Sequence, residues 1–383
     1  MHSDIFSSSS SDNAVEGDLL HGCQDVDLSI MAADPEMWDR FVANAVGGDI
    51  VQTAAWARTK EGGGWQCYPV IAWGDGKILG GAQMLVRRLG PFATIAYIAR
   101  GPLLVDPTSC TLAVQLLDAL EHVANLQHVW HLIIQPPEGG DVIAQELKAR
   151  GYTADAICVA PPATLRVDLT MDLDQILARM SSSRRRNVRQ AETRGLNVRF
   201  VGHEAIATFH ALHKATALRQ GFRPVSRSYL KRQWEVLASR GLVFILMAYH
   251  KGLPLAAMWL TAFGDTITYR LAGWTGEGSS LQPGVACHWA AIKWGKERGY
   301  RWYDLGGIDR DLAALIAAEL PLPLASSSSP AGFKLAFGGY PVLLPPAYQI
   351  GLRPAGRVMA SILRSSCRRH PIVRTIIGSI RGR

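Results

Sequence analysis

Cysteine is scarce in this sequence of 383 residues, and its six cysteines are scattered far from one another. Zinc sites and redox motifs need cysteines about two to four residues apart, so neither kind of site is expected. Thiols without a nearby partner indicate a reduced, cytoplasmic protein. The N-terminal residues are rich in serine and lack a charged start followed by an apolar block, so we expect no secretory signal.

Common nucleotide and hydrolase motifs are also missing. The sequence has no Gly-x-x-x-x-Gly-Lys-Ser/Thr loop, no Gly-x-Gly-x-x-Gly turn, no His-Glu-x-x-His and no Gly-x-Ser-x-Gly elbow. Nucleotide hydrolysis, hydride transfer, zinc proteolysis and serine hydrolysis are therefore disfavoured. Group transfer without a bound cofactor or metal is the class of chemistry that remains.

Long apolar runs are absent as well. The most hydrophobic region, residues 241–263, is interrupted by His250, Lys251 and Pro254, which predicts two core strands joined by a turn and not a membrane span. Hydrophobic residues make up 48% and charged residues 19%, proportions that are typical of a globular chain. The net charge of +8 favours polyanionic partners, namely nucleic acid, anionic lipid or a pyrophosphate-bearing substrate.

The chain is long enough for two domains, and its two halves show the same order of elements. The first half predicts helices over 35–46 and 53–60, a hairpin from 65–73 and 77–88, a strand over 94–99, a helix over 108–126, a strand over 131–135 and a helix over 141–150. The second half predicts helices over 174–194, 203–219 and 228–239, a hairpin from 242–249 and 253–263, a strand over 266–273, a helix over 285–298 and a strand over 301–305. We therefore predict a mixed α/β (α+β) fold of two tandem domains of the N-acetyltransferase (GNAT) type.

Composition sets the expected domain limits. We predict a disordered leader over 1–27, a first domain over 28–160 that is completed by 340–352, and a second domain over 161–339. Residues 311–330 are predicted to form a loop or lid. The remaining tail, 353–383, has eight arginines, no acidic residue and interleaved apolar residues, a pattern typical of a helix on an anionic surface.

Two late motifs carry a resemblance to a known family. Residues 303–308 read Tyr-Asp-Leu-Gly-Gly-Ile, and residues 333–339 read Phe-Lys-Leu-Ala-Phe-Gly-Gly. A lysine between two phenylalanines, beside a glycine pair that allows close backbone approach, suits a phosphate or a carboxylate. Together the two motifs resemble the closing signature of the Fem family, the aminoacyl-tRNA-dependent transferases that build peptidoglycan cross-bridges.

Further patterns resemble the same family in the same order, and together they span most of residues 28–350. They are Gln52 to Trp56 followed by Lys60, Arg100-Gly101-Pro102 followed by Asp106, the helix with Arg186, Arg189 and Ala191, and the turn Arg219-Gln220-Gly221-Phe222. In coenzyme A-dependent GNAT proteins a glycine-rich loop holds the pyrophosphate with backbone amides. Here Pro283 removes an amide and Gly284 comes one position early, so coenzyme A is not expected; such a degenerate loop resembles the Fem family.

The resemblance implies roles for particular residues. It assigns the role of candidate general base to Asp106. It assigns binding of the acceptor substrate to Lys60, Arg223, Tyr269 and Lys334. Because no heptad repeat separates the helices near 174 and 203, no coiled-coil arm is expected. Contact with tRNA is therefore assigned to the basic helix, at Arg184, Arg185, Arg186 and Arg189.

Simpler interpretations of these residues stay open. Lys334 is also suited to cover Phe333 and Phe337 with its aliphatic stem. An arginine run is most often a solvated helix face. Asp106 precedes Pro107 and is equally suited to start a turn before the next helix.

The resemblance implies an aminoacyltransferase, without a cofactor, that moves an amino acid from aminoacyl-tRNA to an amine of a lipid-linked or UDP-linked muropeptide precursor. Two alternatives remain: a GNAT-fold N-acyltransferase with another acyl donor, acting on an exopolysaccharide or a small amine, and a catalytically silent module that binds envelope precursors. We expect a cytoplasmic protein whose basic tail contacts the anionic inner face of the plasma membrane peripherally.

Overall fold

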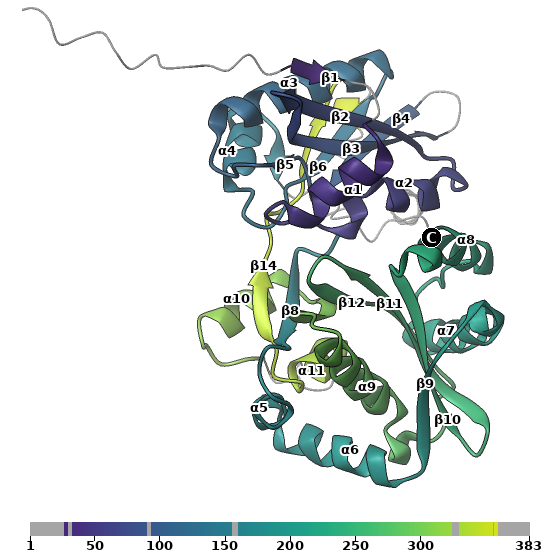
Figure 1. Ribbon diagram of the computed structural model, residues 1–383. Helices are drawn as coiled ribbons and strands as arrows, with labels where there is room; N and C mark the ends of the chain where they lie inside the picture. The colour runs from purple at the N-terminus through teal and green to yellow at the C-terminus, as the bar shows by residue number, and fades with distance from the viewer. Residues whose placement is uncertain are drawn as a thin grey trace, which may run out of the picture.

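The computed structural model describes residues 27–29, 33–89, 93–154, 160–323, 329–354 and 356–358. Two mixed β-sheets lie one above the other in Figure 1. The upper sheet is built from the first half of the chain with one late strand added, and the lower sheet is built from the second half. The predicted leader up to residue 26 and the tail beyond residue 358 lie outside the described residues.

The first sheet has eight strands. Its order is β1 (Asp27–Ser29), β2 (Gln66–Gly74), β3 (Lys77–Leu89), β4 (Ala93–Ala99), β6 (His131–Gln135), β15 (Tyr348–Gly351) and β7 (Thr153–Ala154), with β5 (Leu103–Leu104) paired to β3. Helices α3 (Cys110–Leu126) and α4 (Asp141–Ala149) cover one face, and α1 (Pro35–Asn44) and α2 (Ala54–Glu61) cover the other. The β2–β3 turn uses Asp75 and Gly76, both at positive φ, as the Asp-Gly signal predicts.

The second sheet has seven strands. Its order is β14 (Tyr340–Leu343), β8 (Ala163–Asp168), β13 (Trp302–Gly307), β12 (Thr266–Trp274), β11 (Leu253–Phe263), β10 (Val243–His250) and β9 (Leu196–Val201). One face packs against α9 (Pro283–Glu297) together with α5 (Leu173–Arg179), α6 (Ser182–Thr193) and α11 (Pro330–Leu335). The other face packs against α7 (Ile206–Gln220) and α8 (Arg227–Leu237), while α10 (Arg310–Ala317) lies beside β14.

The single helix predicted over 174–194 is wrong, because the chain forms α5 and α6 instead. Met180 is extended between them, and the Ser181 side chain caps α6 by accepting a hydrogen bond from the Arg184 amide. The Ser181 amide donates to the Ala336 carbonyl over 3.0 Å. A distant segment thus takes the amide that a continuous helix would have used internally.

The end of the chain divides between the two sheets. β14 pairs with β8 in the second sheet, so within 340–352 only β15 joins the first sheet, where it pairs with β6. Figure 1 shows this yellow segment rising from the lower sheet into the upper one. The domain limits themselves stay a prediction.

Strands β12 and β13 are parallel and separate partway along the sheet. They pair only from Thr266 with Trp302 to Thr268 with Asp304, whereas β11 follows β12 to Trp274. Beyond that ladder lie Tyr269 on β12 and Gly306-Gly307 on β13. We call this place the strand split; the side chains around it form the site described below.

The two halves share one hydrophobic cluster. Ile50, Ala55 and Trp56 from the first half pack with Phe209, Leu230 and Trp259 from the second. Burying such a side chain contributes roughly 1.5–3 kcal/mol, so the cluster holds α2 firmly against the second half. Among the described residues no helix is both long and apolar enough to cross a membrane.

Gly338 is expected to be a costly position for alanine. Its φ is +74°, and a Cβ atom there would collide with the Arg179 carbonyl oxygen. Gly252 has a similar φ of +80° but open space around it, so it isolates the backbone effect. We expect Gly252→Ala to lose about 1–2 kcal/mol of unfolding free energy and Gly338→Ala about 2 kcal/mol more, as measured by urea denaturation. Equal losses would contradict the predicted collision.

Candidate active site

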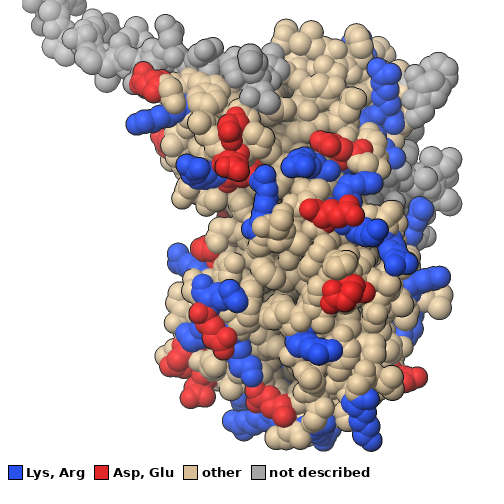
Figure 2. All heavy atoms as spheres, turned by 45° about the vertical axis from the view of Figure 1, so that its right-hand side comes forward, with Lys and Arg blue, Asp and Glu red and all other residues tan. Residues whose placement is uncertain are grey.

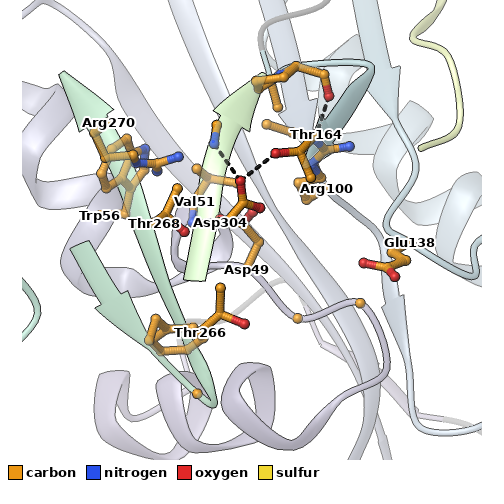
Figure 3. A pocket seen from close by; sticks show the side chains of 18 of the residues that line it. Asp49, Val51, Trp56, Arg100, Glu138, Thr164, Thr266, Thr268, Arg270 and Asp304 are labelled. Atoms are coloured by element: carbon orange, nitrogen blue, oxygen red, sulfur yellow. Dashed lines mark hydrogen bonds between the residues drawn. The ribbon is translucent and has the colours of Figure 1, made fainter. Parts of the chain in front are cut away.

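A cavity of about 1190 Å³ lies between the two halves. Its walls come from the loop after α1, from α2, from the end of β4, from α8, and from β12 and β13. Figure 3 shows part of the lining, with Trp56 and Arg270 on one side and Glu138 on the other. The shared hydrophobic cluster packs α2 and α8, which supply two of these walls, against each other.

One wall of the cavity carries two cations around a single indole. The Lys60 ammonium lies 5.3 Å from the Trp56 ring centroid and donates to the Tyr229 hydroxyl over 2.9 Å, and only 6% of Lys60 is exposed. The Arg270 guanidinium carbon lies 4.8 Å from the same ring centroid, and its Nη2 is buried without a hydrogen-bond partner among the described residues. In that part of the chain neither cation forms a salt bridge, so this wall is suited to an anion.

The opposite wall is internally neutralised. Arg166 forms a salt bridge with Glu138 over 2.7 Å and approaches the Asp304 carboxylate at 3.5 Å. Asp304 also accepts hydrogen bonds from the Thr164 hydroxyl and, over 2.7 Å, from the Gly306 amide. These bonds hold the glycine turn of β13, and Figure 3 shows the Thr164 and Asp304 side chains meeting at the edge of the cavity.

Lys334 reaches the strand split from the side of α9. Its ammonium donates to the Gly307 carbonyl over 2.7 Å and lies 5.8 Å from the Tyr269 ring centroid. Burial lowers the pKa of Lys334 to about 8, against the opposing effect of the Asp304 carboxylate. The cation is therefore largely retained at neutral pH and is lost as the pH rises through about 8. Lys334 is not part of the cavity lining.

His288 lies next to Lys334 but does not act as an acid. Its Nδ1 hydrogen-bonds to the Tyr303 hydroxyl over 2.7 Å. Burial, with the positive charges of Arg184 and Lys334, lowers the pKa of His288 to about 3. The imidazole is consequently neutral at physiological pH, and it supports the neighbouring aromatic rings of Tyr269, Phe333 and Phe337.

The structure brings together only some of the residues selected from the sequence. Lys60 and Tyr269 line the cavity, and Lys334 lies at the adjoining strand split. Arg223 does not line the cavity, because the loop after α7 leaves its side chain exposed to solvent. Arg270 takes the place expected for Arg223 as the second cation near Lys60.

Asp106 is also outside the cavity. It is exposed, and its carboxylate accepts hydrogen bonds from the Thr108 amide and hydroxyl over 2.9 and 2.6 Å, which lower its pKa. The residue thus forms a turn before α3, which is the simpler of its two interpretations. We expect Asp106→Asn to change kcat/KM by less than about threefold, in steady-state assays of transfer. A loss of 100-fold would restore Asp106 as the base.

The arginine run of α6 has two different environments. Arg184 is only 6% exposed and lies over the rings of Phe333 and Phe337, so burial withholds it from an RNA surface. Arg185 donates to the Ala178 and Met180 carbonyls. Arg186 and Arg189 are exposed to solvent, so their contact with tRNA stays a prediction.

Arg270 was missed by the analysis of the sequence, although a signal was present. Arg270 lies at an irregularity of the β11–β12 ladder, between Tyr269, which pairs with Leu260, and Leu271. The strict alternation of a regular strand is interrupted there, and Tyr269 and Arg270 both line the cavity. A cation inside an otherwise apolar strand is rarely buried without a partner ligand or counter-charge. Its placement beside Trp56, however, depends on a helix more than 200 residues earlier.

The start of α9 differs from a coenzyme A cradle. The helix begins at Pro283, which supplies no amide, and Gln282 is at φ +55°. The Asn187 side chain donates to Gln282, and Gln282 in turn donates to the Ser279 carbonyl. In the described parts of the chain, no cluster of three or more His, Cys, Asp or Glu side chains is suited to a metal ion.

The chain is similar to known proteins in both of its halves. The model of the FemAB family matches residues 34–151, and that of an acetyltransferase (GNAT) domain matches residues 178–312. The chain is 29% identical over 215 residues to lipid II:glycine glycyltransferase of Staphylococcus aureus strain MRSA252, which covers 53% of this chain and 51% of the relative. It thus spans about half the length of the curated relatives that it matches.

Two solved structures share the architecture. The crystal structure of FemX matches with a TM-score of 0.76 and 20% identity, covering 88% of this chain and 100% of FemX. A tandem GNAT protein from the clavulanic acid biosynthesis pathway matches with a TM-score of 0.53 and 14% identity, covering 86% and 99%. These matches confirm the predicted tandem GNAT-like fold.

Proposed function

We propose that this chain, whose residues 34–151 match the model of the FemAB family, is an aminoacyltransferase. It would move an amino acid from aminoacyl-tRNA to an amine of a peptidoglycan precursor. The observation that carries the proposal is a pair of cations, Lys60 and Arg270, that lie against the ring of Trp56. They line a cavity that opens beside the strand split. The S. aureus relative is named lipid II:glycine glycyltransferase, which supports an acceptor of this kind.

The cations at Trp56 are suited to the diphosphate of the acceptor. A diphosphate is common to lipid-linked and UDP-linked muropeptides, and arginine recognises it through several donors whereas lysine acts as a point charge. Tyr269 lines the cavity beside the strand split, and in this proposal it shapes the channel for the peptide. With a lipid-linked acceptor the protein would work peripherally at an anionic membrane surface.

The reaction needs positioning and charge stabilisation more than activation. An aminoacyl ester is already reactive. The neutral acceptor nitrogen forms a bond to the ester carbon, the bond from that carbon to the ribose oxygen breaks, and the proton lost by the amine is balanced by one that the ribose oxygen takes up through solvent to become a hydroxyl. Bringing amine and ester together removes much of the entropic barrier. We propose that the Lys334 ammonium, which contacts the Gly307 carbonyl at the split, stabilises the negative oxygen that forms at the ester carbon.

The exposed arginines of α6 are our candidates for contact with the donor tRNA. Arg186 and Arg189 are solvent-exposed on one helix, and Arg185 is partly exposed beside them. Figure 2 shows that lysines and arginines on the face drawn there are dispersed among acidic groups and do not form one large patch. A weak, salt-dependent contact is therefore expected, with about one phosphate per neutralising cation.

Activity is expected to depend on the charge of Lys334. Its pKa of about 8 means that the cation is present below that pH and is lost above it. The nearby carboxylate of Asp304 favours the charge, whereas Arg184 and neutral His288 do not. We expect kcat/KM to turn down above about pH 8, while Lys334→Arg, whose guanidinium does not titrate there, lacks this decline. An identical decline in the variant would assign the pKa to another group.

The decisive test combines total charged tRNA with a purified UDP-linked or lipid-linked precursor. We expect the mass of the precursor to rise by one amino-acid residue, and ribonuclease pretreatment to abolish the change. Transfer that survives ribonuclease and requires another acyl donor would instead assign the chain to N-acyltransferases of the same fold. Binding of the precursor without transfer from any donor would indicate the silent module.

A further inference from the structure

Arg184 is a buried cation in the first turn of α6. No carboxylate of the described residues contributes to its titration; burial alone lowers the pKa of Arg184 to about 10. Its Nε is buried without a hydrogen-bond partner in that part of the chain. A charge buried without a counter-charge costs stability. If the position only had to be filled, methionine would fill it without that cost, so the arginine needs another explanation.

The contacts of Arg184 converge on the helix that carries Lys334. Its Nη2 donates to the Phe333 carbonyl over 3.1 Å, and its guanidinium carbon lies 4.3 and 4.6 Å from the ring centroids of Phe333 and Phe337. At the start of α6, the Ser181 amide also donates to the Ala336 carbonyl. Carbonyl groups on both sides of Lys334 are thus held by α6.

Helix α11 needs such anchors because it has only six residues. Isolated helices of this length are unstable in water, so tertiary contacts set their orientation. We propose that Arg184 is a positioning residue that fixes α11 so that the Lys334 ammonium lies at the strand split. This inference rests on the proposed function, in which that ammonium stabilises the reacting ester.

The proposal explains why the chain breaks between α5 and α6. A continuous helix would carry no capping residue at Ser181 and would leave the Ala336 carbonyl without this donor. The break also brings the Arg179 carbonyl against Gly338, just beyond α11. Contacts from Arg179, Ser181 and Arg184 therefore fix residues 333–338. Among these three residues, Arg184 is the one whose side chain reaches α11 itself.

The test compares Arg184→Lys with Arg186→Lys, a matched change at an exposed position of the same helix. Lysine keeps the positive charge near Lys334 but lacks the planar group that stacks and donates together. We expect the pKa of Lys334, followed by NMR and assigned with Lys334→Arg, to rise from about 8 toward its ordinary value of 10.5. We expect kcat to fall about 100-fold, the scale of an ångström-sized displacement, with little change in the acceptor KM.

Two results with Arg184→Lys alone would overturn the proposal. One is a folded Arg184→Lys protein with unchanged Lys334 titration and unchanged kcat. The other is weaker binding of charged tRNA with kcat intact at saturating donor, which would return Arg184 to the RNA surface. The double variant Arg184→Lys, Lys334→Arg should show non-additive losses, since both act at one point; additive losses contradict the proposal.

If Arg184→Lys does not fold, Arg184→Met fills the same space without a buried charge, and the same fall in kcat is expected; an unchanged kcat overturns the proposal. The Lys334 titration needs neither donor nor acceptor. A displaced Lys334 without any transfer to a peptidoglycan precursor would therefore contradict the proposed function but leave the positioning role intact.

Discussion

A protein carrying both Lys60→Met and Arg270→Met is expected to show an acceptor KM raised about 1000-fold, with kcat changed by less than about threefold. Each cation is expected to contribute about 2 kcal/mol through charge-assisted hydrogen bonds to phosphate, and 1.4 kcal/mol corresponds to a factor of ten. Both lie within 5.3 Å of the Trp56 ring centroid, so they are expected to hold the same diphosphate. Methionine retains most of each aliphatic stem, which limits changes in packing.

The measurement is steady-state kinetics with varied acceptor at saturating donor, together with calorimetric binding of the UDP-linked precursor. Arg223→Met is the matched control, because that arginine is exposed and does not line the cavity. We expect the control to change KM by less than about twofold. If Arg223→Met weakens binding of the acceptor as much as the Lys60→Met, Arg270→Met protein does, the phosphate site lies where the sequence motif placed it. The assignment of that site to the cavity would then be wrong.

Replacing Lys334 by methionine is expected to lower kcat by about 100- to 1000-fold, the usual loss when one oxyanion-stabilising donor is removed. The acceptor KM should change little, because Lys334 is not part of the cavity lining. Its ammonium instead contacts the Gly307 carbonyl at the strand split. Lys334→Arg keeps a cation at a different reach, and we expect it to recover part of the lost rate.

Single-turnover transfer from preformed aminoacyl-tRNA separates this effect from binding and product release. A raised acceptor KM with unchanged kcat would contradict the charge-stabilising role and support the phosphate-binding role that the family resemblance implies. The thermal midpoint of Lys334→Met should not fall, because methionine removes a partly buried charge whose folded-state pKa is already depressed.

Local signals in the sequence predicted much of the fold. The two hairpin turns, Asp75-Gly76 and Lys251-Gly252, adopt positive φ at both central residues, a conformation that depends only on the turn and its flanking strands. The helices before and after them begin at side chains that cap their own amides, such as Thr53 and Ser226. Such features need no distant partner, which is why periodicity and turn chemistry located them.

Several elements could not be predicted from local pattern. Strands β8 and β9 have no predicted counterpart, and β14 and β15 are short segments that depend on partners far away in the chain. The break at Ser181 depends on a carbonyl more than 150 residues later. Long-range pairing of this kind leaves little periodic signal in the segment itself.

The candidate site divides in the same way. Motif resemblance was enough to select Lys60, Tyr269 and Lys334, because each belongs to or follows a recognisable pattern. It also selected Asp106 and Arg223, whose patterns place them on exposed turns. Arg270 belongs to no motif, and only the packing of α2 against the second half brings it to the ring of Trp56.

By itself, the sequence determined the class of fold, the tandem order of the elements and the family resemblance, since these follow from short-range periodicity, turns and motifs. Tertiary structure alone decided which cations share a wall, which arginine of α6 is buried, and where the Lys334 ammonium lies. The physical reason is that charge acts through distance in space. Arg184 and Phe333 are 149 positions apart in the chain, yet the Arg184 Nη2 atom lies 3.1 Å from the Phe333 carbonyl oxygen in the folded protein.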